Sequence, residues 1–140
     1  MFSCQNKQNT TANIDTTSKD NQVGNQNLSL CFQRLEGIQK QDSTFINLIF
    51  KGDSVSGILN HLPYEKDSRK GSLQGIRNGD TIKALWSFMQ EGMNDTISVE
   101  FKLSENELHQ KTWGIDKNTG RQKLTDTSTF SLRYQKIDCR

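Results

Sequence analysis

The sequence predicts an all-β protein: a small antiparallel up-and-down β-barrel of about eight strands, preceded by a disordered N-terminal tether. Three observations support this prediction. Apolar and polar residues alternate from about residue 30 onward, turn residues separate the alternating segments, and the segment before them is almost entirely polar. No segment repeats apolar residues at the three- and four-residue spacing of an amphipathic helix over three turns.

The alternation is clearest over residues 96–103, where Ile97, Val99 and Phe101 are separated by polar residues. Successive side chains of a strand point to opposite faces, so this pattern predicts one buried and one exposed face. Similar runs recur along the chain. We expect strands near residues 31–36, 43–51, 54–62, 72–77, 80–89, 96–103, 107–114 and 129–136.

Tight-turn sequences lie between several of these segments. Residues 51–54 (Lys-Gly-Asp-Ser) and 77–80 (Arg-Asn-Gly-Asp) join alternating runs directly. Glycine and asparagine tolerate the positive φ angles that a two-residue hairpin turn requires. Residues 104–107 predict a third turn, and residues 117–120 predict a looser fourth. Sequential strands with short turns are typical of an up-and-down barrel or of a two-sheet sandwich.

Two of the three cysteines bear on the choice between barrel and sandwich. Cys31 opens the first expected strand, and Cys139 follows the last one. The first and last strands of a closed barrel are neighbours, which brings the two sulfur atoms within reach of a disulfide. Such a bond requires an oxidising compartment and therefore export. The alternative is a pair of unrelated buried thiols.

The third cysteine, Cys4, follows residues 1–3 (Met-Phe-Ser) and precedes a long polar stretch. This order resembles the lipobox of bacterial lipoproteins, in which the cysteine thiol receives a diacylglycerol and the signal peptide before it is removed. The resemblance implies lipidation of Cys4, a membrane anchor and a place in the cell envelope. The charged and apolar regions of a signal peptide are missing here, so the alternative is a cytosolic chain with an incidental cysteine.

Composition divides the chain at about residue 30. Residues 5–29 are dominated by Asn, Gln, Thr and Ser. Such a segment buries too little apolar surface to offset its chain entropy, so we expect it to be disordered. The predicted organisation is a lipobox remnant and tether over residues 1–29, then one barrel domain over residues 30–140.

Charge and hydropathy exclude several classes of partner. The chain has 140 residues, a mean hydropathy of −0.78 and a formal net charge of +2, with acidic and basic residues interspersed. This distribution lacks the basic patch of a nucleic-acid-binding protein. No apolar run approaches the roughly 18–20 residues that a membrane-spanning helix needs.

Two segments carry a resemblance to a family. Residues 62–67 (Leu-Pro-Tyr-Glu-Lys-Asp), followed by Gly71 and Gly75, resemble a pattern in small uncharacterised exported lipoproteins of Bacteroidetes. Residues 87–92 (Ser-Phe-Met-Gln-Glu-Gly) are similar to a second segment of that family. The resemblance covers residues 31–139 and implies a lipid-anchored domain with a lipocalin-like (calycin-type) barrel. The tether lacks the acidic run that accompanies surface display in this group, which favours a periplasm-facing domain on the outer membrane.

The sequence shows no pattern typical of an enzyme or a metal site. His61 and His109 are the only histidines, and no Cys/His spacing supports a metal centre. There is no nucleophile elbow and no glycine-rich loop entering a helix. We therefore predict no catalytic residues, no metal and no cofactor.

The densest charged segment, residues 64–70, joins two expected strands and would lie at one rim of the barrel. Loops of this kind carry binding residues disproportionately often. Glu91 ends another strand, and an even number of strands brings it to the same rim. The candidate ligand- or partner-binding residues of the rim are Tyr64, Glu65, Lys66, Asp67 and Glu91. The alternative is a solvated loop with a structural ion pair between Glu91 and Lys66 or Arg69.

The inward-facing aromatic residues decide between two functions. Eight strands enclose an interior that side chains fill or that holds one small ligand. Because many large residues point inward, we expect a filled barrel, a non-catalytic structural or interaction protein. Its outer wall, including Phe45, Ile49 and Leu85, would contact envelope proteins.

The alternative is a lipocalin-like binding module for a small apolar or amphipathic ligand. It predicts a cavity that is lined by Trp86, Phe88 and Phe101 and opens at the rim of residues 64–70. In either case we expect a monomer that binds no nucleic acid and reaches the membrane only through its lipid anchor.

Overall fold

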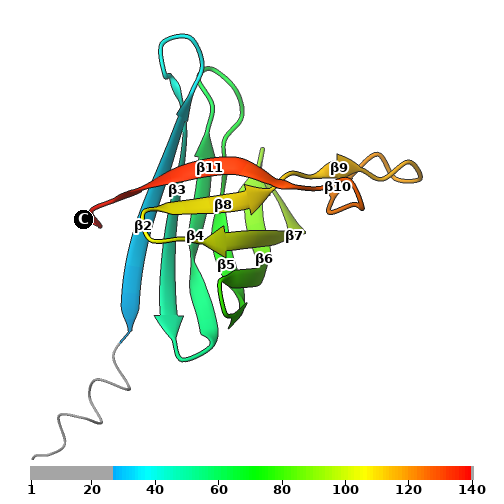
Figure 1. Cartoon of the computed structure of the whole chain (residues 1–140). Helices are drawn as coiled ribbons and strands as arrows, with labels where there is room; N and C mark the ends of the chain where they lie inside the picture. The colour runs from blue at the N-terminus through cyan, green and yellow to red at the C-terminus, as the bar shows by residue number, and fades with distance from the viewer. Residues whose placement is uncertain (1–26, 140) are drawn as a thin grey trace, which may run out of the picture.

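The computed structural model describes residues 27–139 and is built from antiparallel strands (Figure 1). Eight of them close into a barrel in the order β11-β2-β3-β4-β5-β6-β7-β8. These strands are β2 (Leu28–Glu36), β3 (Asp42–Lys51), β4 (Ser54–Leu62), β5 (Arg69–Asn78), β6 (Thr81–Gln90), β7 (Met93–Leu103), β8 (Glu107–Lys111) and β11 (Phe130–Ile137). The predicted all-β class and the closed eight-stranded antiparallel barrel are confirmed. Cys4 and most of the expected tether lie outside the described residues.

The hairpin turns follow from the residues that occupy them. In the two-residue turns at 52–53 and 79–80, Gly52 and Gly79 take φ angles of 61° and 63°. Between β6 and β7, Glu91 and Gly92 both have positive φ, at 52° and 77°. Turns of this type match the right-handed twist of paired strands, so short connections join most neighbours of the barrel.

The strand expected over residues 107–114 is shorter than predicted. β8 ends at Lys111, and residues 112–129 leave the barrel. This segment forms a small separate hairpin of β9 (Gly114–Ile115) and β10 (Gln122–Lys123). This hairpin projects to the right of the barrel in Figure 1. Trp113 continues the apolar alternation although its backbone has left the sheet. Its ring stacks on Trp86, a side chain of the barrel interior, which accounts for an apolar residue at this position. The other barrel strands begin and end within about three residues of the expected bounds.

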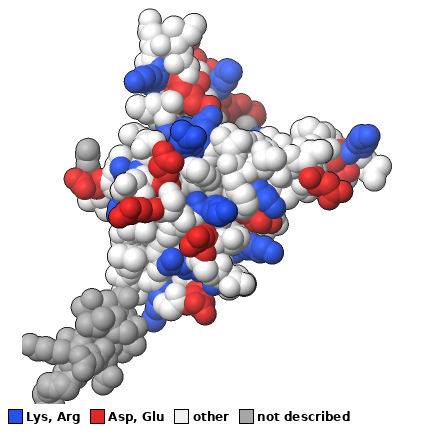
Figure 2. Space-filling model, in the orientation of Figure 1, with Lys and Arg blue, Asp and Glu red and all other residues white. Residues whose placement is uncertain are grey.

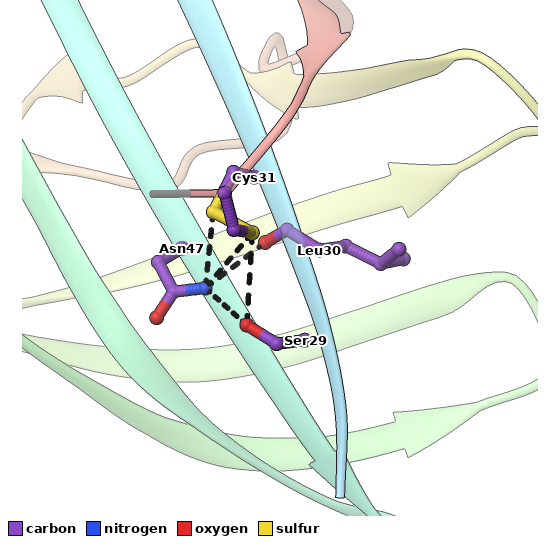
Figure 3. The surroundings of a disulfide bond; sticks show 5 residues. Ser29, Leu30, Cys31 and Asn47 are labelled. Carbon is purple, nitrogen blue, oxygen red and sulfur yellow. Dashed lines mark hydrogen bonds between the residues drawn. A yellow bond between two sulfur atoms is a disulfide. The ribbon is translucent and has the colours of Figure 1, made fainter.

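The disulfide between Cys31 and Cys139 is present, with the two Cα atoms 5.3 Å apart. It lies beside the seam where β11 pairs with β2, a pairing of only three residue pairs, whereas β2 and β3 share nine. The Asn47 side-chain amide donates a hydrogen bond to the Ser29 hydroxyl at 2.8 Å and lies 3.3 Å from the Cys31 sulfur (Figure 3). The bond joins residues separated by 108 positions in the sequence. In the chain-entropy model, a disulfide that closes a loop of this length raises the free energy of unfolding by about 4–5 kcal/mol.

Two glycines of β5 are required by a close approach between strands. A Cβ atom at Gly71 would lie 1.9 Å from the backbone oxygen of Ser87, and one at Gly75 would lie 2.1 Å from that of Lys83. Both positions face the barrel interior, so the missing side chains let β5 press against β6.

The hydrophobic core occupies one half of the interior. We call this the packed half; it lies toward the turns at 52–53, 79–80 and 104–106, and β2 begins beside it. All eight barrel strands contribute to the core. Its members are Phe32, Ile46, Leu48, Phe50, Val55, Leu59, Leu73, Ile82, Ala84, Trp86, Phe88, Val99, Phe101, Leu108 and Tyr134.

On the outside of the barrel, acidic and basic side chains are mixed, as the face in Figure 2 shows. Among residues 27–139 there is no helix that could cross a membrane.

Candidate ligand-binding cavity

An open cavity of about 1130 Å³ occupies the other half of the barrel interior. We call this the hollow half; its mouth is bordered by the loops at 37–41 and 63–68. The apolar and aromatic lining residues are Leu59, Trp86, Trp113, Leu132 and Tyr134. The polar residues of the wall are Arg34, Thr44, His61, Arg69, Gln90, Gln110 and Gln122. The rim consists of Glu36, Gly37, Asp42, Pro63, Glu65, Lys66 and Asp67.

Two stacked tryptophan rings are among the residues that line this cavity. Trp86 and Trp113 stack with ring centroids 6.0 Å apart and planes 4° from parallel. The Trp86 indole N–H donates to the backbone oxygen of Leu59 at 3.0 Å, and that of Trp113 donates to the backbone oxygen of Ser98 at 2.9 Å. Because both N–H groups are satisfied by backbone, the rings are held in fixed orientations; Trp86 is 1% exposed, so Trp113 supplies most of the accessible ring surface of the pair.

Tyr134 and Gln110 form a buried polar pair at the base of the cavity. The Tyr134 hydroxyl donates to Oε1 of Gln110 at 2.6 Å. Burial raises the pKa of Tyr134 far above its usual range, so the phenol is neutral and remains a donor at physiological pH. Gln110 is only 1% exposed, and burying such an amide is unfavourable unless its polar atoms are bonded.

A second polar pair lies on β3 and β4. Oγ1 of Thr44 and Nδ1 of His61 are 2.8 Å apart. Burial lowers the pKa of His61; the nearby Glu36 carboxylate opposes this shift and the Arg69 charge reinforces it. The imidazole is therefore neutral at physiological pH, and among the described contacts its Nε2 atom makes no hydrogen bond.

The two arginines of the wall have different partners. Arg34 forms an ion pair with Glu36, which lowers the pKa of that carboxyl group. Nε of Arg69 donates to Oε1 of Gln90 at 3.1 Å, and its Nη1 donates to Oε1 of Gln122 at 2.9 Å. Since Gln122 belongs to β10, this second hydrogen bond connects the projecting hairpin to the barrel wall.

At the rim, the loops are joined by carboxylates. Oδ1 of Asp42 accepts the backbone N–H of Tyr64 at 2.6 Å, which connects the β2–β3 and β4–β5 loops. The carboxyl groups of Asp67 and Glu91 hydrogen-bond to each other, and this contact raises the pKa of Glu91. No ion pair joins Glu91 to Lys66 or Arg69 among the described residues.

The structure places the sequence-predicted residues in three environments. Glu65, Lys66, Asp67 and Trp86 line the cavity. Tyr64 and Glu91 lie on the rim loops next to it, with Tyr64 half-exposed. Phe88 packs behind Trp86, with ring centroids 4.3 Å apart, and Phe101 is fully buried in the packed half. The interior is thus filled at one end and hollow at the other.

The three apolar residues expected to form an outer patch do face outward. Phe45 and Ile49 are on β3, and Leu85, which is 47% exposed, is on β6. Strands β4 and β5 lie between β3 and β6, so the three side chains do not form one continuous patch.

The sequence contains a signal that could have revealed the polar wall. Arg34, His61 and Gln110 each come two residues after a core residue of the same strand and so continue its inward register. Inward polar residues at matching ends of several strands indicate a solvated interior rather than a packed one.

The donor set does not favour a metal centre. Among residues 27–139, no group of three or more His, Cys, Asp or Glu side chains is placed to hold a metal ion.

Comparison with known proteins finds no matching family model, no matching curated protein and no matching solved structure. The resemblance to Bacteroidetes lipoproteins therefore stays a prediction, while the eight-stranded antiparallel barrel is established by the strand pairing itself.

Proposed function

We propose that this protein is a non-catalytic binding module, exported and lipid-anchored, that holds one small polar or amphipathic molecule in the hollow half of its barrel. The observation that carries the proposal is the inward-facing polar wall around an open cavity of about 1130 Å³. That volume is slightly above the roughly 300–1,000 Å³ of typical small-molecule sites, which combine aromatic surface with a few fixed polar groups. The binding module thereby becomes the leading hypothesis, ahead of a filled structural barrel.

Stability alone does not account for this wall. Thr44 and Gln110 are 4% and 1% exposed, and each is held by one side-chain hydrogen bond. A barrel that only had to be stable would gain more from apolar side chains at these inward positions, because buried polar groups are costly when incompletely bonded. Polar groups that are fixed by neighbours but keep unused donors and acceptors are instead typical of a site that recognises a ligand.

The disulfide and the direction of β2 support the proposed export and anchoring. Disulfides persist in oxidising compartments such as the periplasm, and Cys31 and Cys139 form one. β2 begins beside the packed half, so an anchor that precedes it leaves the cavity mouth unobstructed. Together with the lipobox resemblance of Cys4, this favours lipidation of that cysteine and a domain facing the periplasm from the outer membrane.

Replacing Cys4 with serine tests the anchor. A lipidated chain resists extraction from membranes because its acyl chains are buried in the bilayer. We expect the unchanged chain, expressed with a lipoprotein signal peptide, to incorporate labelled fatty acid and to sediment with membranes. Cys4→Ser should incorporate no labelled fatty acid. Equal labelling of the two proteins would contradict the proposed anchor and leave the binding proposal unaffected.

The binding function is tested by the native mass of the full chain, purified gently and compared with a denatured sample. We expect an additional, non-covalent mass in the native sample alone. Thr44→Trp places an indole in the cavity wall and should abolish the additional mass. Phe45→Trp, on the outer face of the same strand, should retain it.

A native mass equal to the denatured mass in all three proteins, together with no binding of added probes, would overturn the proposal. The structural or interaction barrel would then be the better account, with exposed outer-wall residues such as Ile76 and Leu85 as its contact points.

A further inference from the structure

The charges around the cavity are arranged by depth. Its carboxylates belong to the rim, where Glu36, Glu65 and Asp67 are exposed, Asp42 is partly buried, and Lys66 adds one exposed positive charge. The arginines, Arg34 and Arg69, are partly buried on inward strand positions. An anionic group that enters the cavity therefore passes screened, solvated carboxylates and reaches guanidinium groups at contact distance, where the attraction is stronger.

Only one of the two arginines is neutralised. Arg34 forms an ion pair with Glu36. Arg69 has no carboxylate partner among the described residues, because both of its side-chain acceptors are the neutral amides of Gln90 and Gln122. A glutamate at either position would have cancelled the charge, whereas glutamine orients the guanidinium and leaves the charge in place.

The orientation of Arg69 is fixed on a second side as well. Its guanidinium carbon lies 5.3 Å from the centroid of the Phe88 ring, which supports one face of the group. The described contacts use Nε and Nη1, so Nη2 keeps its donors for another acceptor. An arginine held in this way is suited to binding the paired oxygens of a carboxylate, phosphate or sulfonate group.

We infer that the ligand carries an anionic group bound by Arg69 and a flat apolar part that packs against the stacked Trp86–Trp113 pair, chiefly against Trp113. The inference rests on the proposed function and names the class of ligand that the same cavity accepts: a small amphipathic anion. Both surfaces line one cavity, so a single small molecule can contact them together.

A matched pair of fluorescent probes tests the inference on the full chain. Anilinonaphthalene sulfonate carries a sulfonate group, and N-phenylnaphthylamine has the same aromatic skeleton without it. The chain has two tryptophans, and both line the cavity, so quenching of tryptophan fluorescence reports binding there. We expect the sulfonate to bind about tenfold more tightly than the neutral probe, as one charge-assisted contact allows.

Two arginines of β5 supply the variant and its control. Arg69→Gln should weaken binding of the sulfonate about tenfold and leave the neutral probe unchanged, while Arg69→Lys should retain part of the difference. Arg77 also lies over an aromatic ring, that of Phe50 at 5.0 Å, but outside the cavity. Arg77→Gln should therefore leave both affinities unchanged.

Equal affinities for the two probes, unaffected by Arg69→Gln, would overturn the inference while leaving the binding function standing. Failure of both probes to quench tryptophan fluorescence would count against both proposals. If Arg69→Gln does not fold, the salt dependence of binding to the unchanged protein tests the inference instead. Added salt should weaken binding of the sulfonate and leave binding of the neutral probe unchanged. Equal salt dependence for the two probes would overturn the inference.

Discussion

The two halves of the barrel interior are built on the same strands and differ only in their side chains. β4 places Val55 in the core, Leu59 at the boundary between core and cavity, and His61 in the cavity wall, all in one inward register. β3 likewise continues from Leu48 in the core to Thr44 in the wall. The backbone therefore does not determine where the barrel is filled. Apolar side chains make the packed half a source of stability, and polar side chains make the hollow half a candidate site.

The largest expected effect comes from removing a side chain of the packed half. Phe101 is fully buried, so Phe101→Ala should lower the free energy of unfolding by about 3–5 kcal/mol. Leu132→Ala, in the hollow half, should cost about 1 kcal/mol, because that side chain is only partly buried and faces the open cavity. Urea unfolding measures both. Similar losses at the two positions would contradict the division of the interior.

Removing the disulfide should affect stability and spare binding. We expect Cys31→Ser combined with Cys139→Ser to lower the free energy of unfolding by about 2–5 kcal/mol, because the bond closes a long loop at a seam of three residue pairs. Neither cysteine lines the cavity, so the affinity for anilinonaphthalene sulfonate should not change. Unfolding with and without reductant, with a probe titration, checks this. Loss of sulfonate binding in a folded double variant would show that the pairing of β11 with β2 determines the shape of the cavity.

A smaller effect is expected from the protonation of His61. Burial lowers the pKa of His61 in the folded protein, so as the pH falls below the ordinary histidine value of about 6.5, the unfolded chain binds a proton first. Stability should therefore decrease with falling pH through this range and be fully present above it. His61→Gln should remove this component of the pH dependence. Unfolding curves at a series of pH values measure the difference.

Most of the barrel could be predicted from local patterns, because strand alternation and hairpin turns are local properties. The segment 96–103 is a strand as expected, and the turns at 52–53 and 79–80 use the glycines that the sequence offers. The pairing of Cys31 with Cys139 follows from closure of the barrel, which makes the first and last strands neighbours.

The cavity could not be predicted in the same way, because its lining residues come from strands and loops that are far apart in sequence. The aromatic residues suggested a filled interior or an aromatic cavity, but Phe88 and Phe101 pack in the core, and only Trp86 reaches the open space. Trp113 misled the prediction of the strand over residues 107–114, because it fits the alternation while belonging to the segment 112–129, which leaves the barrel. The contacts of Arg69 join residues far apart in sequence, and a local pattern does not contain them.

The most direct test of this division is a side-chain methyl NMR titration of the full chain with anilinonaphthalene sulfonate. Leu59 and Leu132 line the cavity, Leu48 and Val55 belong to the core, and Leu85 faces outward. We predict that the methyl signals of Leu59 and Leu132 shift with increasing probe concentration. The methyl signals of the two core residues and of Leu85 should remain unchanged. Shifts confined to Leu85 would locate binding on the outer wall and contradict the assignment of the hollow half as the ligand site.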